Sequence, residues 1–497
     1  MKKPSDSLFQ LIKSLTGQEK RYFKIFASRH TIGEKNNYLK LFDAIDKQVE
    51  YDETEIKEKC KKEKFIKQLF VVKGYLYEMI LKSQDAYYTE SSIEIQLKHW
   101  VHYIEILYNK ALYDQCKKMI EKAEKQAVKH EYYLVLLDII DWKFKLARVI
   151  TATKTFEDGL DVLHQQKQVV VEKISNHYQY KWLNAKLIST TMRKGWFPRS
   201  TEEIQKEYDP IMAHPIFENE ENALSLQSKI LFHNTFSAYF HLKGDNQKSY
   251  SHSKEAEKIL SENIFLIDIN QEDYIACLSN LIFTSMFLVK YQETFQYINI
   301  LKNINPRSKM LQAKIITSAY LPEIISYNIN GNIDAGLKLI PEVVNKLLLY
   351  ESHINPKEIL YLKYNFACLY FKAGEFNESS HWLFKILNDS AINYLPDLHS
   401  KARILNLMVH SELKNDDLLP YVLRSTYRFL LKQKKLYKFE KRVIDFIRNS
   451  SNVSSKNTIA SFKSLKLDLI ELSKDPYEKK AIDFFGFINW VDKKIVK

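Results

Sequence analysis

Six basic residues near the end of the chain have the spacing of an anion-binding surface. They are Arg424, Arg428, Lys432, Lys435, Lys438 and Arg442. Residues three or four positions apart lie on one face of a helix, so this series predicts a positive stripe. Cationic side chains contact phosphates, and interleaved aromatic rings stack on bases. The aromatic residues of the segment are Tyr421, Tyr427, Phe429, Tyr437 and Phe439. The pattern indicates a candidate nucleic-acid site. An acidic protein partner would also bind these cations.

A simpler interpretation treats the same stripe as the solvated side of an ordinary helix. Tyr427, Leu430 and Leu431 would then form the core face, with the cations on the opposite side. We favour this interpretation and keep anion binding as the alternative.

The charge distribution keeps the alternative open. The formal net charge is +13, and residues 424–497 carry 18 Lys and Arg against 8 Asp and Glu. Residues 91–423 are nearly balanced, with 38 basic against 39 acidic side chains. A local excess of one sign acts on a partner more strongly than a diffuse one.

A second basic group lies near the start of the chain. Lys20, Arg21, Lys24 and Arg29 line an expected short helix, and a small helical domain can read DNA through a helix-turn-helix. Acidic residues such as Asp43 and Asp46 lie nearby in the sequence. We therefore favour a structural bundle over a DNA-binding module, because a fold by itself carries no function.

Motifs for catalysis or for cofactor and metal binding are absent from the sequence. It contains no Gly-rich phosphate loop, no His-Glu-x-x-His and no Gly-x-Ser-x-Gly. Asp138 and Asp141 lie one helical turn apart, and we expect them to bond between helices. The four cysteines, Cys60, Cys116, Cys277 and Cys368, stand far from one another, so neither a disulfide framework nor a zinc site is expected. We expect a non-enzymatic protein without cofactor, in a reducing cytoplasm.

The elements that position these residues are helices. Pro is absent between Pro4 and Pro198, and apolar residues recur at helical spacing. The most apolar window, residues 279–289, is too short to span a membrane, so no membrane insertion is expected. All-α is the predicted fold class.

Residues 359–387 give the clearest unit, two amphipathic helices around a turn at Gly374. The positions that define it are Ala367, Tyr370, Gly374, Phe376, Ser379 and Leu383. This order of small, aromatic, Gly, aromatic and small residues resembles the tetratricopeptide repeat. The resemblance implies helical hairpins stacked into an α-solenoid with a concave binding face.

The same offsets recur along much of the chain. Turn centres are expected near residues 244, 289, 331, 374 and 415, which are 45, 42, 43 and 41 residues apart. The tetratricopeptide unit has 34 residues, so the prediction is a tetratricopeptide-like array of longer hairpins. A related turn is expected at Ala111-Leu112-Tyr113.

Four regions are predicted from these patterns. Residues 1–90 form an N-terminal helical bundle with a capping box at Thr16 and Glu19. Its long helix is expected from Phe65 to Tyr88, with an apolar face that includes Phe70, Tyr77 and Leu81. Residues 91–222 form a first repeat array, with two helices between Phe156 and Trp196 and a Pro-containing insertion at 195–222. Residues 223–433 form a second array. Residues 434–497 form basic helices and a C-terminal capping helix.

Two N-terminal stretches, SLFQLIKSLTGQEKRYFKIFASRH and FIKQLFVVKGYLYEMILKS, resemble the N-terminus of uncharacterised helical proteins of Bacteroidota. The resemblance implies a full-length helical architecture and a bacterial cytoplasmic setting, and it implies no activity. We expect a scaffold that binds a protein or peptide on the concave face of the array. The alternative is a nucleic-acid-binding protein with a regulatory role that uses the stripe or the N-terminal bundle.

Overall fold

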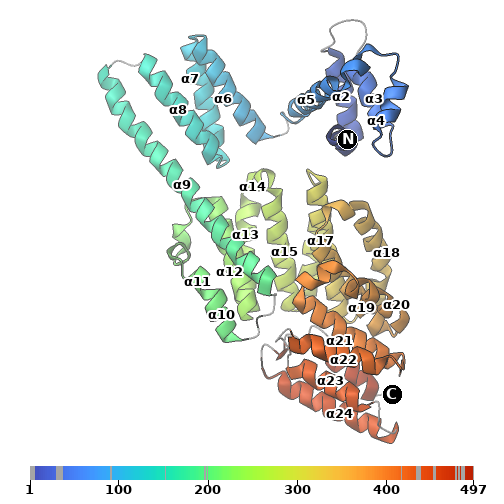
Figure 1. The fold of residues 1–497 in the computed structure, drawn as a ribbon. Coiled ribbons are helices and arrows are strands. Elements are labelled where there is room, and N and C mark those ends of the chain that lie inside the picture. The colour runs from blue at the N-terminus through green and yellow to red at the C-terminus, as the bar shows by residue number, and fades with distance from the viewer. Residues whose placement is uncertain are drawn as a thin grey trace. The chain divides into compact units, whose positions relative to one another are not determined.

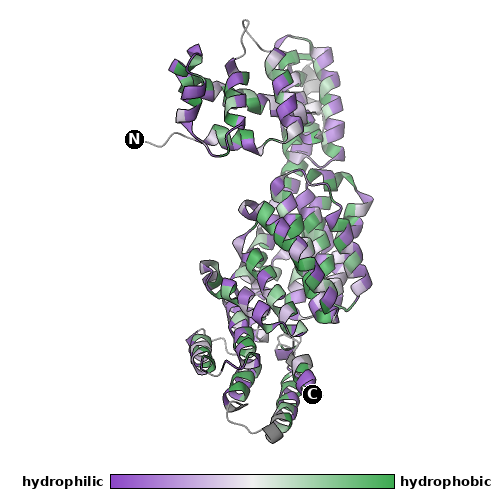
Figure 2. Ribbon diagram, turned by 90° about the vertical axis from the view of Figure 1, so that its right-hand side faces the viewer, coloured by the Kyte–Doolittle hydropathy of each residue, from purple (hydrophilic) through white to green (hydrophobic). Residues whose placement is uncertain are grey.

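The computed structural model describes residues 6–29, 37–89, 92–150, 153–194, 198, 200–415, 417–432, 438–450, 455–475, 478–479, 482 and 487–495. These residues form helices joined by short turns, without any strand, so the predicted all-α class is confirmed (Figure 1). The chain divides into two compact units, residues 1–171 and 172–497. Apolar and polar residues alternate around most helices, as expected for helices that bury one side (Figure 2).

The first unit begins with a small bundle. Its elements are α1 (Ser7–Ser14), α2 (Gly17–Arg29), α3 (Asn37–Asp46), α4 (Glu53–Lys59), the 3-10 turn η1 (Lys64–Gln68) and α5 (Leu69–Tyr88). Phe23, Phe42 and Ile45 are fully buried at its centre. The capping box is present: the Thr16 amide donates to Glu19 Oε2 at 2.6 Å, and the Glu19 amide donates to Thr16 Oγ1 at 3.3 Å.

The long helix of this bundle differs from the prediction. The segment from Phe65 starts as the 3-10 turn η1, and α5 begins only at Leu69. The expected apolar face is also wrong in part, because Phe70, Tyr77 and Leu81 are exposed. Leu69, Leu76 and Ile80 are buried instead. The helix carries apolar residues on two sides, and the bundle covers only one of them.

Three helices follow, α6 (Ile93–Asn109), α7 (Tyr113–Lys129) and α8 (Tyr133–Ile150), and each packs on the next. They lead into α9 (Thr153–Lys194), a helix of 42 residues that continues across the division between the units. The prediction of two helices between Phe156 and Trp196 was wrong. No Pro interrupts this segment, so nothing ends the helix before residue 194.

The insertion after α9 is compact. It contains α10 (Thr201–Glu207), α11 (Asp209–Met212), η2 (Pro215–Phe217) and η3 (Glu220–Asn222). Ile211 and Phe217 are buried, and Trp196 and Phe197 lie outside the described residues. The Asn176 side chain on α9 donates to the Asn222 carbonyl at 2.8 Å and accepts from the Leu224 amide at 3.1 Å. These bonds anchor the insertion to α9.

The rest of the second unit is a succession of helical pairs. The pairs are α12 (Leu226–Lys243) with α13 (Asn246–Glu262), α15 (Gln271–Phe287) with α16 (Tyr291–Lys302), α17 (Lys309–Asn330) with α18 (Ile333–Tyr350), α19 (Pro356–Ala373) with α20 (Phe376–Leu387), and α21 (Pro396–Glu412) with α22 (Leu419–Lys432). Short elements α14 (Phe265–Ile269), η4 (Glu351–His353) and η5 (Ser390–Tyr394) join some pairs. Each first helix contacts the first helix of the next pair, and each of α13, α16, α18 and α20 also contacts the following first helix (Figure 1).

The turns inside these pairs share one backbone conformation. A residue with positive φ stands in all five, namely Gly244, Val289, Gly331, Gly374 and Lys414. At Gly374, its amide bonds to the Phe371 carbonyl and the next amide bonds to the Tyr370 carbonyl, which is the Schellman pattern that ends a helix. The turn at Ala111 in the first unit has the same pair of bonds, from the amides of Ala111 and Leu112. Four of the five expected centres are therefore confirmed, and the fifth lies one residue earlier than expected.

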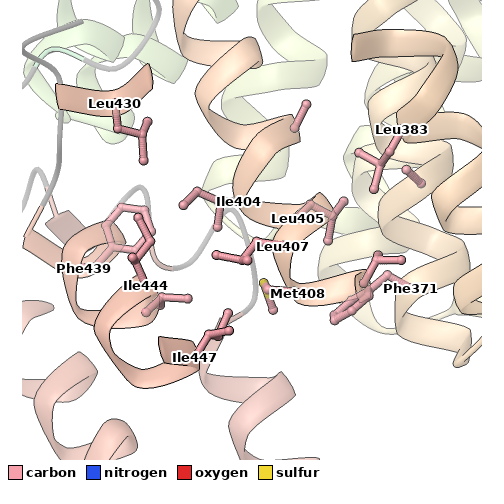
Figure 3. Packing of buried hydrophobic residues seen from close by; sticks show 14 of the residues in the cluster. Phe371, Leu383, Ile404, Leu405, Leu407, Met408, Leu430, Phe439, Ile444 and Ile447 are labelled. Carbon is pink, nitrogen blue, oxygen red and sulfur yellow. The ribbon is translucent and has the colours of Figure 1, made fainter. Parts of the chain in front are cut away.

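The last helices in the described part of the chain are α23 (Lys438–Ser450), α24 (Ser455–Leu472) and α26 (Phe487–Ile495). These helices continue the core of the last pairs, in which Phe371, Met408, Phe439 and Ile447 belong to one buried cluster (Figure 3). The helix α26 packs mainly on α24. In the part of the chain that the structure describes, no helix is both long and apolar enough to cross a membrane.

Candidate functional site

The first three cations of the predicted stripe lie on the exposed side of α22. Arg424, Arg428 and Lys432 point to solvent, while Leu423, Thr426 and Leu430 on the opposite side are buried. Leu431, which we assigned to the core face, is instead exposed, because it lies one position beyond Leu430 and turns away from the core. The spacing in the sequence thus placed the cations correctly and one apolar residue wrongly.

The other half of the stripe has a different environment. Lys438 is exposed at the start of α23, whereas Arg442 donates from Nε to Asp468 Oδ2 at 2.6 Å. Lys435 lies outside the described residues, so the continuity of the stripe from α22 to α23 stays a prediction. Arg442 is already neutralised by Asp468 on α24, so it contributes less to a field that attracts anions.

The acidic residues described nearby also bond within the chain. Glu478 accepts the amide hydrogens of Lys438 at 2.9 Å and of Phe439 at 3.1 Å, so a carboxylate distant in sequence caps the N-terminus of α23. The helix α22 itself contains no Asp or Glu. Among the described residues, no carboxylate forms an ion pair with Arg424, Arg428 or Lys432, which lie on its exposed side.

The aromatic residues of the segment are mostly engaged. The guanidinium of Arg448 lies 5.4 Å from the ring centroid of Tyr427, and that of Arg403 lies 4.5 Å from the centroid of Phe429. Phe439 is fully buried, and Tyr437 lies outside the described residues. Tyr421 is exposed. The sequence pattern suggested base stacking on five rings. Among the described residues, only Tyr421 is clearly exposed and free to stack on a base.

Arg403 reaches α22 from α21 and fixes a neutral histidine. Its Nε donates to Nε2 of His399 at 3.0 Å, and Nη1 donates to Ser425 Oγ at 3.2 Å. Burial, together with the neighbouring Arg403 cation, lowers the pKa of His399 to about 4. His399 therefore stays neutral near pH 7 and accepts the hydrogen of Arg403, a bond within α21, while the bond from Arg403 to Ser425 joins α21 to α22.

A second surface is formed by the first helices of the pairs. We call it the first-helix face and define it by residues that are half-buried on successive first helices: Phe283 and Phe287 on α15, Lys314, Ser318 and Leu321 on α17, and Tyr361, Cys368 and Lys372 on α19. Three contacts join neighbouring helices on this side. The rings of His241 and Phe287 lie 5.0 Å apart, Lys314 Nζ lies 2.6 Å from Glu272 Oε1, and Lys372 Nζ donates to the Asn328 carbonyl at 2.6 Å. The face thus continues from α12 to α19.

Amide side chains form further bridges between first helices. Asn280 Nδ2 donates to Asn234 Oδ1 at 3.1 Å, and Asn328 Nδ2 donates to the Asn365 carbonyl at 3.1 Å. Both bonds satisfy polar groups that would otherwise be costly in a largely buried contact. They fix the register of one first helix against the next.

The chemistry of Cys368 argues against a nucleophilic role. Burial raises the pKa of its thiol to about 11, despite the nearby cations of Lys372 and Lys401. The reactive form of cysteine is the thiolate, so Cys368 is protonated and inert near pH 7. Burial, with a smaller contribution from Asp397, raises the pKa of Tyr361 to about 12, so this phenol is neutral as well. The face therefore offers contact surface and hydrogen bonding.

Three of the remaining sequence candidates, Lys20, Lys24 and Asp141, are engaged in ion pairs. In the N-terminal bundle, Lys20 lies 2.6 Å from Asp46 and Lys24 lies 2.7 Å from Asp43, which neutralises two of the four cations considered for DNA contact. Asp141 forms an ion pair with Lys167 of α9. Among the described residues no cluster of three His, Cys, Asp or Glu side chains has the arrangement of a metal site.

The fold and these surfaces define an all-helical protein whose second unit is built from consecutive helical pairs. Comparisons with protein-family models, with curated proteins and with solved structures find no match for this chain.

Proposed function

We propose that the protein is a non-enzymatic scaffold that binds a protein or peptide, and that its second unit is a tetratricopeptide-like α-solenoid with the first-helix face as its concave side. The observation that carries the proposal is the order of packing: each helical pair contacts the next pair along the chain, and the first helices form one contacting row. Stacked repeats bind extended or helical peptides along such a row.

The composition of the first-helix face supports this function. Phe287, Leu321 and Tyr361 offer apolar and aromatic contact area, and Lys314, which is paired with Glu272, and Lys372 add polar groups to the face. Aromatic residues contribute strongly to binding interfaces. The protonated thiol of Cys368 fits recognition better than covalent chemistry. We further propose that α26 caps the end of the array, and that the protein acts in a bacterial cytoplasm.

A photo-crosslinking amino acid tests the scaffold proposal. We expect that a benzoylphenylalanine residue at position 361, on the first-helix face, captures one discrete partner in cells, and that the purified partner then binds the unmodified protein. The same residue at position 384 is the matched control, because Phe384 is exposed on α20, a second helix. Capture of the same partner from position 384 alone would contradict the proposed binding face.

Nucleic-acid binding through α22 is the second candidate. The specific observation that favours it is the row Arg424, Arg428 and Lys432, which is exposed on a helix without acidic residues. Each phosphate contact by such a cation releases counterions, so binding of this kind weakens steeply with salt.

A further inference from the structure

The exposed side of α5 is an apolar stripe that the bundle leaves uncovered. Phe70, Tyr77 and Leu81 lie at helical spacing on that side, and Phe70 keeps 88% of its surface exposed. Gly74 lies between them, and a Cβ built on it meets no atom within 4 Å. A helix that is apolar on two sides is ordinarily covered on both. The stripe therefore has the properties of an interface.

We propose that the occupant is α5 of a second copy of this chain, packed antiparallel to the first. An antiparallel pair with its two-fold axis midway between Gly74 and Tyr77 places Phe70 opposite Leu81 of the other copy. The same register places Gly74 opposite Tyr77 of the other copy, so a large ring meets the position without a side chain. Each contact occurs twice, as the isologous interface of a two-fold dimer requires.

The charges at the two ends of the stripe match this arrangement. Lys67 is exposed in η1, directly before α5, and Asp85 is exposed near the C-terminal end of α5. An antiparallel pair brings the Lys67 end of one copy to the Asp85 end of the other, whereas a parallel pair would bring like charges together. His99 Nε2 lies 3.4 Å from Asp85 Oδ1. The carboxylate retains more than half of its side-chain exposure beside this histidine.

A single helix pair is a small interface, so the dimer is expected to be weak and concentration-dependent, with a dissociation constant of roughly micromolar order. The test is sedimentation velocity of the full chain across a concentration series up to about 100 µM. We expect the wild type to shift from monomer to dimer and the Phe70→Glu variant to stay monomeric. Phe384→Glu, which replaces an exposed Phe on α20, is the control and should dimerise like the wild type.

Charge reversal separates the interface from a loss of folding. Lys67→Glu and Asp85→Lys should each weaken dimerisation at least several-fold, and the double variant should recover it. Disulfide trapping then fixes the direction: copies that carry Phe70→Cys should cross-link to copies that carry Leu81→Cys more efficiently than to themselves. A wild type that stays monomeric throughout the series, a Phe70→Glu variant that still dimerises, or preferential cross-linking between two copies with Cys at 70 would each overturn the proposal.

Discussion

The indole Nε1 of Trp490 donates a hydrogen bond to Oε1 of Glu412 at 2.9 Å, across 78 residues of sequence. Lys494 Nζ lies 2.6 Å from the other carboxylate oxygen of Glu412. The carboxylate is largely buried, so both partners satisfy a charge that would be costly if left alone. These contacts join the last described helix, α26, to the end of α21.

Removing this carboxylate should therefore loosen the C-terminal helices. We expect Glu412→Ala to lower the free energy of unfolding by about 2–3 kcal/mol, since it breaks two bonds to a charged group. Trp490→Phe retains the ring and loses one bond, so it should cost about 1 kcal/mol. Urea denaturation measures both. Equal effects of the two variants would show that the carboxylate has no role beyond the indole bond.

The turn at Gly374 gives a conformational prediction. Its φ is +86°, and a Cβ there has open space, so any penalty comes from the backbone and not from a clash. Gly374→Ala should destabilise the protein by about 1 kcal/mol. Thermal unfolding measures the change, and an unchanged midpoint would contradict the assignment of a left-handed residue at this turn.

Val289 occupies the equivalent turn position with φ 62° and carries a β-branched side chain in a conformation that such residues rarely adopt. Its side chain is exposed, so little packing is lost on truncation. Val289→Gly should therefore stabilise the protein by up to about 1 kcal/mol. The matched control is Val128→Gly, at an exposed position within α7, which should destabilise it by a similar amount.

His399 predicts a pH dependence of stability. Its folded pKa of about 4 lies below the ordinary value of 6.5, so the unfolded chain binds more protons between these two values. The free energy of unfolding should consequently fall as the pH drops from about 6.5 towards 4. Protonation of His399 in the unfolded chain accounts for about 2–3 kcal/mol of this loss at about pH 4. His252, whose pKa burial lowers to about 4 with a further contribution from His233, adds in the same direction.

The contribution of His399 is isolated by His399→Gln, whose amide can still accept the Arg403 hydrogen. Denaturation of wild type and variant at pH 7 and pH 4.5 should show a smaller loss of stability for the variant. An identical loss in both proteins would assign the pH dependence to other groups.

Charge reversal on α22 tests nucleic-acid binding. We expect Arg424→Glu, Arg428→Glu and Lys432→Glu together to abolish any salt-sensitive retention on heparin or single-stranded DNA. The matched control reverses Lys117, Lys118 and Lys125, which are exposed on α7, and changes the net charge by the same amount. If both triple variants lose retention equally, the interaction depends on total charge and α22 is not a binding site.

The amino-acid sequence determined the helices and the turns between them. Hydrogen bonds within a helix are local, and a Gly such as Gly374 ends a helix through its own backbone freedom, so both leave a readable pattern. The spacing of Arg424, Arg428 and Lys432 placed them on one exposed side for the same reason.

Only the tertiary structure decided which faces are covered and which charges are paired. Arg442 pairs with Asp468, and Glu478 caps α23, through contacts between segments that are far apart along the chain. The side of α5 around Phe70 is exposed because the bundle does not cover it. Periodicity shows that a helix has an apolar side, but the packing of other helices determines whether that side is buried. A side chain's partner is likewise fixed by the fold, because the distance between two residues along the chain says little about their distance in space.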